Sequence, residues 1–124
     1  MAQINSFRDL IVYQKAYKLS MEVFNVTRTF PKEEKYSLTD QIRRSSRSVC
    51  ANLSEAWAKR LYPKAFVNKL TDSLGEEFET ETWLCYSKDC KCMEEQTYNE
   101  LMSKYAEVRK MLISMINNLD KFCK

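Results

Sequence analysis

The sequence contains no histidine among its 124 residues, only one glycine and only two prolines. The lack of histidine removes the commonest general base, the commonest metal ligand and every serine–histidine or cysteine–histidine nucleophile pair. A single glycine cannot build a Walker loop or a G-x-G-x-x-G dinucleotide-binding loop. So few turn-forming residues also argue against the many tight turns of a β-sandwich or β-barrel. These absences disfavour both an enzyme and an all-β fold.

Long apolar runs are also missing. The first ten residues, MAQINSFRDL, have no apolar segment typical of a signal peptide. No run elsewhere approaches the roughly 20 apolar residues that a membrane span needs. The five cysteines are odd in number and irregularly spaced, which fits reduced thiols better than a disulfide framework. We therefore expect a soluble, cytoplasmic protein that makes no contact with membranes.

The sequence does contain helical periodicity. In residues 38–60, LTDQIRRSSRSVCANLSEAWAKR, apolar and small residues recur every three or four positions and form one helix face. Similar patterns run through residues 6–30, 64–89 and 94–124. Because the connections are short, successive helices must run antiparallel. The sequence predicts an all-α protein, an antiparallel up-down-up-down four-helix bundle that forms a single domain over residues 1–124.

Several residues predict where these helices begin and end. Ser6 with Asp9 predicts an amino-terminal cap for the first helix, and Pro31 predicts its end. Ser37 is a plausible cap for the second helix. Gly75 lies inside the third helix, where we expect it to mark a close approach of another helix rather than a break.

Charge differs sharply between the second and third predicted helices. The second carries a net charge of +3 and the third −3. Basic side chains that follow a phosphate backbone would give a salt-dependent affinity for nucleic acid. Ion pairing with the acidic third helix is the alternative, and both interpretations stay open. The candidate nucleic-acid-binding residues are Arg43, Arg44, Arg47, Lys59 and Arg60.

The carboxylates of the acidic segment EEFETE are possible metal ligands. Carboxylate bundles that bind two metals use Glu-x-x-His motifs, which this chain cannot supply. Cys90-x-Cys92 has the wrong spacing for a zinc site and no second half. We therefore expect no metal and no cofactor. Glu81 falls on the apolar stripe and needs a partner, so we predict an ion-pair network of Arg44 with Glu79 and Glu81.

Four segments of the chain form a recognisable set: FRDLIVYQKAY, FPKEEKYSLTDQIRR, ANLSEA and LGEEFETET. With them, nearly the whole chain resembles the 23S rRNA intervening-sequence proteins. This family is similar to the accessory variability protein of diversity-generating retroelements. The resemblance implies a homopentameric barrel of four-helix bundles with a central channel and no known catalysis. In the retroelement relatives, it further implies binding to nucleic acid and to a reverse transcriptase.

Two hypotheses follow for the function. In the first, the protein is a non-enzymatic oligomer that binds RNA, DNA or a ribonucleoprotein partner through its basic second helix. In the second, it is an assembly or protein-interaction bundle whose arginines are consumed by structural ion pairs. The two differ in whether nucleic acid binds at all.

Overall fold

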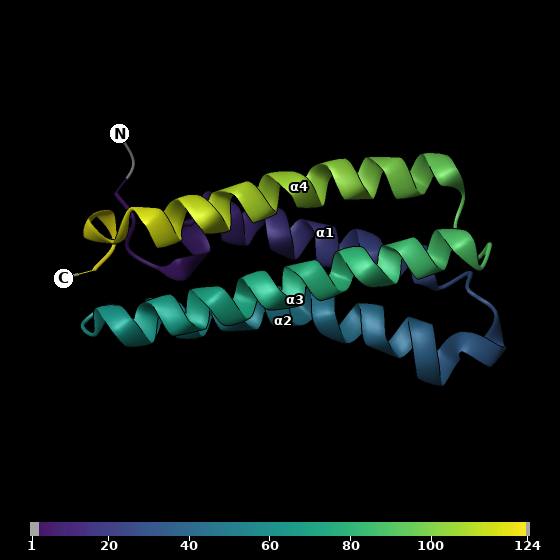
Figure 1. Cartoon of the computed structure of the whole chain (residues 1–124), viewed down its shortest axis with the longest axis horizontal. Helices are drawn as coiled ribbons and strands as arrows, with labels where there is room; N and C mark the ends of the chain where they lie inside the picture. Colours follow the sequence, from purple (N-terminus) through teal and green to yellow (C-terminus); the bar gives the residue numbers. More distant parts are fainter. Residues whose placement is uncertain (1–2, 124) are drawn as a thin grey trace.

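The computed structural model describes residues 3–123, and these form four long antiparallel helices that lie side by side (Figure 1). Each helix packs against two neighbours, so that α1 contacts α2 and α4, while α3 contacts α2 and α4. No β-strand occurs within residues 3–123, so the predicted all-α bundle is confirmed. Lys124, the last residue of the fourth predicted helix, lies outside the described residues. The helices are α1 (Ile11–Thr27), α2 (Asp40–Ala58), α3 (Pro63–Asp89) and α4 (Glu95–Asn117).

The first helix is shorter than predicted at both ends. Ser6 and Asp9 do form a capping box, but it closes a single 3₁₀ turn, η1 (Phe7–Asp9). Leu10 then adopts an extended conformation, and α1 begins only at Ile11. At the other end, i→i−3 hydrogen bonds such as Phe30 N–H to the Thr27 carbonyl tighten the chain before Pro31. The helical turns therefore end before Pro31, as expected. The α-helix itself ends at Thr27, three residues before Phe30.

The entry to α2 also differs from the prediction. The chain passes through a 3₁₀ turn, η2 (Lys32–Glu34), and a five-residue π-helical turn, η3 (Lys35–Thr39). Ser37 lies inside the π-helical turn and its hydroxyl donates to the carboxylate of Glu34 at 2.7 Å. It therefore does not cap α2, which begins at Asp40 without a side-chain cap.

The core contains small and polar side chains as well as large apolar ones. Thr80 on α3 donates to the hydroxyl of Ser45 on α2 at 2.8 Å, and Ser73 donates to the carbonyl of Val49 at 2.8 Å. Such small side chains let α2 and α3 lie close together while their hydroxyls stay hydrogen-bonded. The largest fully buried side chains are Ile42, Leu53, Phe66, Leu70, Glu77, Leu84, Tyr105 and Leu112.

Gly75 does not mark a close helix approach, and this prediction was wrong. The residue is exposed on α3, and a Cβ built on it would meet nothing within 4 Å. Its conformation is ordinary helix, because no glycine in the described chain has a positive φ. The glycine therefore costs helix propensity without any compensating contact inside the subunit.

Replacing Gly75 by alanine should raise the free energy of unfolding by about 1 kcal/mol, since alanine is the best helix former and the site is open. Urea unfolding followed by circular dichroism measures this change. A loss of stability instead would mean that another molecule packs against Gly75 in solution.

Candidate nucleic-acid interface

The five predicted basic residues of the second helix do not form one surface. Arg43 and Arg47 lie toward α1, whereas Arg44 reaches the acidic side chains of α3. Lys59 and Arg60 lie at the far end of the helix, roughly 20 Å from Arg47 at 1.5 Å per residue. The five predicted residues therefore lie in three separate parts of the structure.

Two of these arginines gather with Arg28 around the ring of Phe24. The guanidinium carbon of Arg43 lies 4.7 Å from the ring centroid, that of Arg47 5.8 Å and that of Arg28 6.0 Å. Arg43 is further fixed because its Nε donates to the hydroxyl of Thr27 at 2.8 Å. We call Arg28, Arg43 and Arg47 around Phe24 the Phe24 arginine cluster.

The Phe24 arginine cluster carries uncompensated positive charge. In the described part of the chain, none of its three guanidinium groups lies within 4.0 Å of a carboxylate. Arg28 and Arg47 are exposed, and Arg43 is half-buried. Guanidinium groups offer paired donors that match the oxygens of a phosphate, and a ring face holds them by cation–π attraction. This geometry suits an anion such as a nucleic-acid phosphate.

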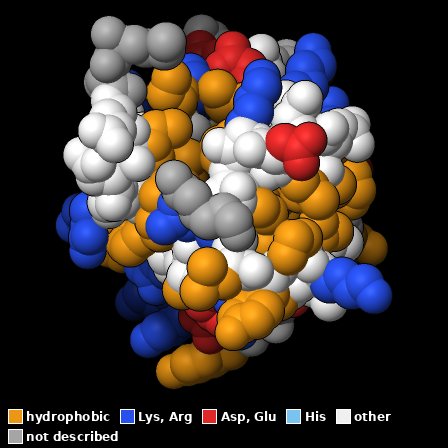
Figure 2. All heavy atoms as spheres, turned by 90° about the vertical axis from the view of Figure 1, so that its left-hand side faces the viewer, with side chains coloured by type: hydrophobic (Ala, Val, Ile, Leu, Met, Phe, Trp, Pro, Cys, Tyr) orange, Lys and Arg blue, Asp and Glu red, His pale blue; other side chains and the backbone are white. Residues whose placement is uncertain are grey.

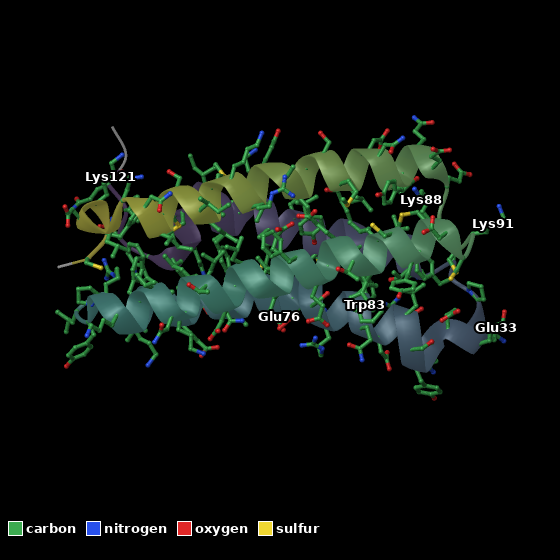
Figure 3. The ribbon with its side chains drawn as sticks, viewed as in Figure 1. Glu33, Glu76, Trp83, Lys88, Lys91 and Lys121 are labelled. Carbon is green, nitrogen blue, oxygen red and sulfur yellow. The ribbon has the colours of Figure 1, made fainter. Side chains whose placement is uncertain are left out.

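Arg44, in contrast, is held by acidic residues of α3. Its Nη2 donates to Glu79 at 2.6 Å and its Nη1 to Glu76 at 3.3 Å. The indole of Trp83 also donates to Glu79, at 3.1 Å. Glu76 and Trp83 project from α3 on the side that faces α2 (Figure 3). Although burial opposes the charge, the hydrogen bonds from Arg44 and Trp83 hold the pKa of Glu79 below its usual value.

Glu81 does not join this network, and here the sequence-based prediction was wrong. Its carboxylate accepts from Arg109 of α4 at 2.7 Å rather than from an arginine of the second helix. The reason is helical geometry, because residues two positions apart, such as Glu79 and Glu81, point to nearly opposite sides of a helix. One arginine of α2 therefore reaches Glu79 and leaves Glu81 to the helix on the other side.

The end of α2 carries the remaining two candidates. The Arg60 guanidinium stacks over Trp57 at 3.6 Å and its Nε donates to the Trp57 carbonyl at 2.9 Å. Lys59 is exposed. The next residues, Leu61 and Tyr62, are 67% and 68% exposed. Figure 2 shows this end of the bundle, where hydrophobic and basic side chains lie side by side.

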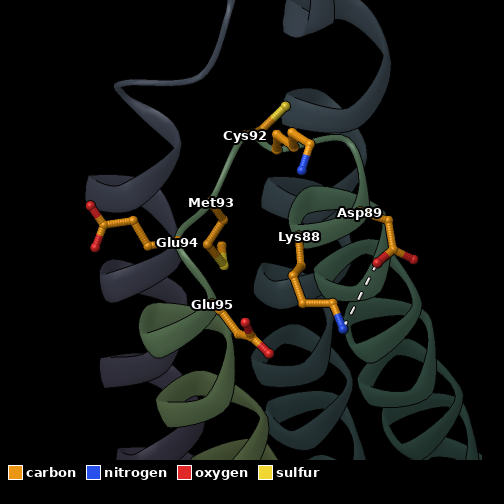
Figure 4. A pocket seen from close by; sticks show the side chains of 7 residues that line it. Lys88, Asp89, Cys92, Met93, Glu94 and Glu95 are labelled. Carbon is orange, nitrogen blue, oxygen red and sulfur yellow. Dashed lines mark ion pairs between the residues drawn. The ribbon is translucent and has the colours of Figure 1, made fainter.

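The α3–α4 corner forms a hollow of about 550 Å³, but its residues do not assemble a metal site (Figure 4). Lys88 pairs with its neighbour in the chain, Asp89, at 3.8 Å, and both line the hollow. Cys90 is exposed and Cys92 is partly buried, and both thiols are free. Within residues 3–123, no three cysteine or carboxylate side chains gather closely enough to hold an ion. The corner thus offers free thiols without a ligand cage.

Sequence reasoning missed Phe24, Arg28 and Arg109. The signal for the first two was present, since Phe24 and Arg28 are spaced i, i+4 and such residues meet on one helix face. Arg109 follows the buried Val108 on α4, but only the packing of α4 against α3 shows which acid it meets.

The described helices include none with a length and apolar character that would carry it across a lipid bilayer.

The chain is similar to known proteins in sequence and in structure. The sequence model of a family described as 23S rRNA-intervening sequence protein matches residues 8–114, which include most of all four helices. A crystal structure from Bacteroides thetaiotaomicron, described as a protein with unknown function from the S23 ribosomal protein family, is similar with a TM-score of 0.79. The two chains are 30% identical, and the match covers 86% of this chain and 96% of the other. No curated protein matches the chain.

Proposed function

Because the chain belongs to the family of 23S rRNA-intervening sequence proteins, we propose that it is a non-enzymatic, oligomeric bundle of the cytoplasm that binds nucleic acid. The observation that carries the proposal is the Phe24 arginine cluster, where three guanidinium groups share one ring and none has a carboxylate partner among the described residues. Its ligand is the phosphate backbone, and the contact is expected to be tolerant of sequence.

The structure narrows the candidate residues. Arg44 is withdrawn from the nucleic-acid candidates because Glu76 and Glu79 already compensate its charge. Arg28 is added, because it lies on the same ring as Arg43 and Arg47. Lys59 and Arg60 remain as a second contact for a longer strand, about 20 Å along α2 from the cluster.

Reversing two charges of the cluster tests this proposal. The double substitution Arg43→Glu and Arg47→Glu should weaken binding to unrelated RNA and single-stranded DNA by about tenfold or more at low salt. It should also reduce the dependence of log affinity on log salt by about two, one for each lost phosphate contact. Fluorescence anisotropy across a salt series measures both quantities.

The matched control is the double substitution Lys110→Glu and Lys121→Glu, which changes net charge equally at exposed sites away from the cluster. It should lower affinity only slightly. An equal loss in both variants would show that net charge rather than the cluster governs binding. Absence of binding by the wild-type protein even at low salt would end the proposal.

A second candidate function is assembly alone, with the arginines buried at subunit contacts. It is favoured by exposed apolar side chains on the outer faces of two helices, since Tyr17 and Met21 on α1 are 53% and 45% exposed. On α3, Phe78 and Tyr86 are 49% and 54% exposed. Such side chains gain most when a second subunit covers them.

Native mass spectrometry distinguishes the two candidates. A homopentamer free of nucleic acid, whose mass collapses in the Arg43→Glu and Arg47→Glu variant, favours assembly. Co-purifying nucleic acid that the same variant loses while keeping its oligomeric mass favours the binding function. The further resemblance to the retroelement accessory protein would gain support only from the second result.

A further inference from the structure

The centre of the bundle contains a carboxylic acid that has no counter-ion of its own. Glu77 on α3 is fully buried, and neither of its carboxyl oxygens accepts a hydrogen bond in the described chain. The next residue, Phe78, is 49% exposed, so the acid rather than the aromatic ring lies in the core. A buried carboxylate without a donor would cost several kcal/mol, so the group must be neutral or share its charge.

The neighbour of Glu77 on its own helix is another acid rather than a base. Glu81 lies one turn along α3, at the i, i+4 spacing that makes two side chains neighbours, and its carboxylate helps burial to raise the pKa of Glu77. Among the described residues, the cation that faces this pair is Arg109 of α4, which is bound to Glu81 at 2.7 Å. Two carboxyl groups therefore share a single guanidinium.

The other titratable groups of the surrounding helices cannot supply a second positive charge. Tyr105 of α4 is fully buried and its hydroxyl has no hydrogen-bond partner. Cys50 of α2 is also buried, and burial raises the pKa of both groups, which keeps them neutral. On α1, the nearest acid is Glu22, which acts on Tyr105 and is already paired with Lys104 at 3.0 Å. The pair is thus short of one cation.

We infer that Glu77 is protonated in the folded bundle, so that folding takes up a proton and the α3–α4 contact responds to pH. Arg109, Glu81 and protonated Glu77 then carry no net charge at this contact. When the proton leaves, two carboxylates compete for one arginine and the contact weakens.

The sign of the effect follows from burial. Burial first, and the nearby Glu81 carboxylate second, raise the pKa of Glu77 from 4.5 to about 9. A carboxyl whose pKa is higher in the folded state stabilises the fold fully below its unfolded value. That stability is lost as pH rises from the unfolded value toward about 9. The bundle should therefore be tighter in mild acid than in mild base.

The composition makes this effect easy to isolate. Because the chain has no histidine, no imidazole titrates between pH 5.5 and pH 7.5. Ordinary thiols and the α-amino group titrate above this range, and ordinary glutamates below it. A change of stability with pH within this range should therefore come from carboxyl groups whose pKa is raised.

Urea unfolding between pH 5.5 and pH 7.5 tests the inference. The unfolding equilibrium constant of the wild-type protein should rise about tenfold per pH unit. Glu77→Gln, which is neutral and of the same shape, should be nearly independent of pH. The matched control is Glu76→Gln, whose pKa is also raised by burial but which lies partly exposed beside Arg44. It should keep most of the wild-type slope.

A flat wild-type profile, or a slope that survives in Glu77→Gln, would overturn the inference. If the variant does not fold, carbon-13 NMR of labelled glutamate carboxyl groups in the wild-type protein decides the question. One carboxyl carbon should keep the chemical shift of the protonated acid at pH 7, and a spectrum in which every glutamate is ionised would refute the protonation of Glu77. Neither measurement involves nucleic acid, so its outcome is separate from that of the proposed function.

Discussion

Replacing Arg109 by methionine should lower the free energy of unfolding by about 2 to 3 kcal/mol at pH 7. Methionine is also a long unbranched side chain, but the substitution removes the cation that, among residues 3–123, lies beside Glu81 and Glu77. Removing one partner of a fully buried pair typically costs roughly 3 to 5 kcal/mol. We expect somewhat less here, because the side chains of Arg109 and Glu81 are 30% and 17% exposed. Thermal and urea unfolding at fixed protein concentration measure the loss.

The structure offers a matched control in a second cross-helix ion pair of α4. Lys15 of α1 lies 3.4 Å from Glu107, but these side chains are 45% and 61% exposed. Lys15→Met should therefore change stability by less than about 1 kcal/mol, because water already solvates both charges. Equal effects of the two substitutions would show that the Arg109 pair is no more than a surface ion pair.

The long-range architecture was predictable because apolar spacing records which face of each helix is buried. The stripe in residues 38–60 identified Ile42, Val49 and Leu53, which are all buried. Pro63 is the first residue of α3, a position that suits proline because its missing N–H would be unpaired there anyway. Short connections then leave only antiparallel neighbours.

Local features were less predictable because they depend on competition between neighbouring signals. The Ser6 capping box is real, but the extended conformation of Leu10 limits it to one 3₁₀ turn. Ser37 has the chemistry of a cap, yet Glu34 takes its hydroxyl within the turn. A cap motif thus indicates a helical turn without fixing how far the helix continues.

Candidate contacts between helices were the hardest to predict. Sequence alone indicated that a basic helix faces an acidic one, and Arg44 does contact Glu79. Glu79 and Glu81 lie about 200° apart around the helix axis, so the sequence alone already argues against a common partner. Glu77 shows a real limit, since only the packed structure shows that its buried carboxyl has no hydrogen-bond partner in the described chain.

Replacing Tyr105 by alanine should have the largest effect of any substitution considered, a loss of about 3 to 5 kcal/mol in the free energy of unfolding. Tyr105 is the largest of the fully buried side chains and lies on α4 near Glu77. Its removal leaves a cavity in the middle of the bundle that neighbouring helices can close only in part. Because small domains have only about 5 to 15 kcal/mol of stability, the variant should be partly unfolded at physiological temperature.

Tyr105→Phe separates the ring from its hydroxyl. The phenol oxygen faces Ser46 from α2 but has no hydrogen bond in the described chain, while the Ser46 hydroxyl donates to the Arg43 carbonyl at 3.0 Å. Deleting a buried hydroxyl that lacks a partner removes a desolvation cost, so the phenylalanine variant should be as stable as the wild type or about 1 kcal/mol more stable. Unfolding curves of the two variants in the same buffer measure both effects. A large loss in Tyr105→Phe would mean that the hydroxyl is hydrogen-bonded in solution, and the polar centre of the bundle would then be a connected network rather than an isolated acid pair.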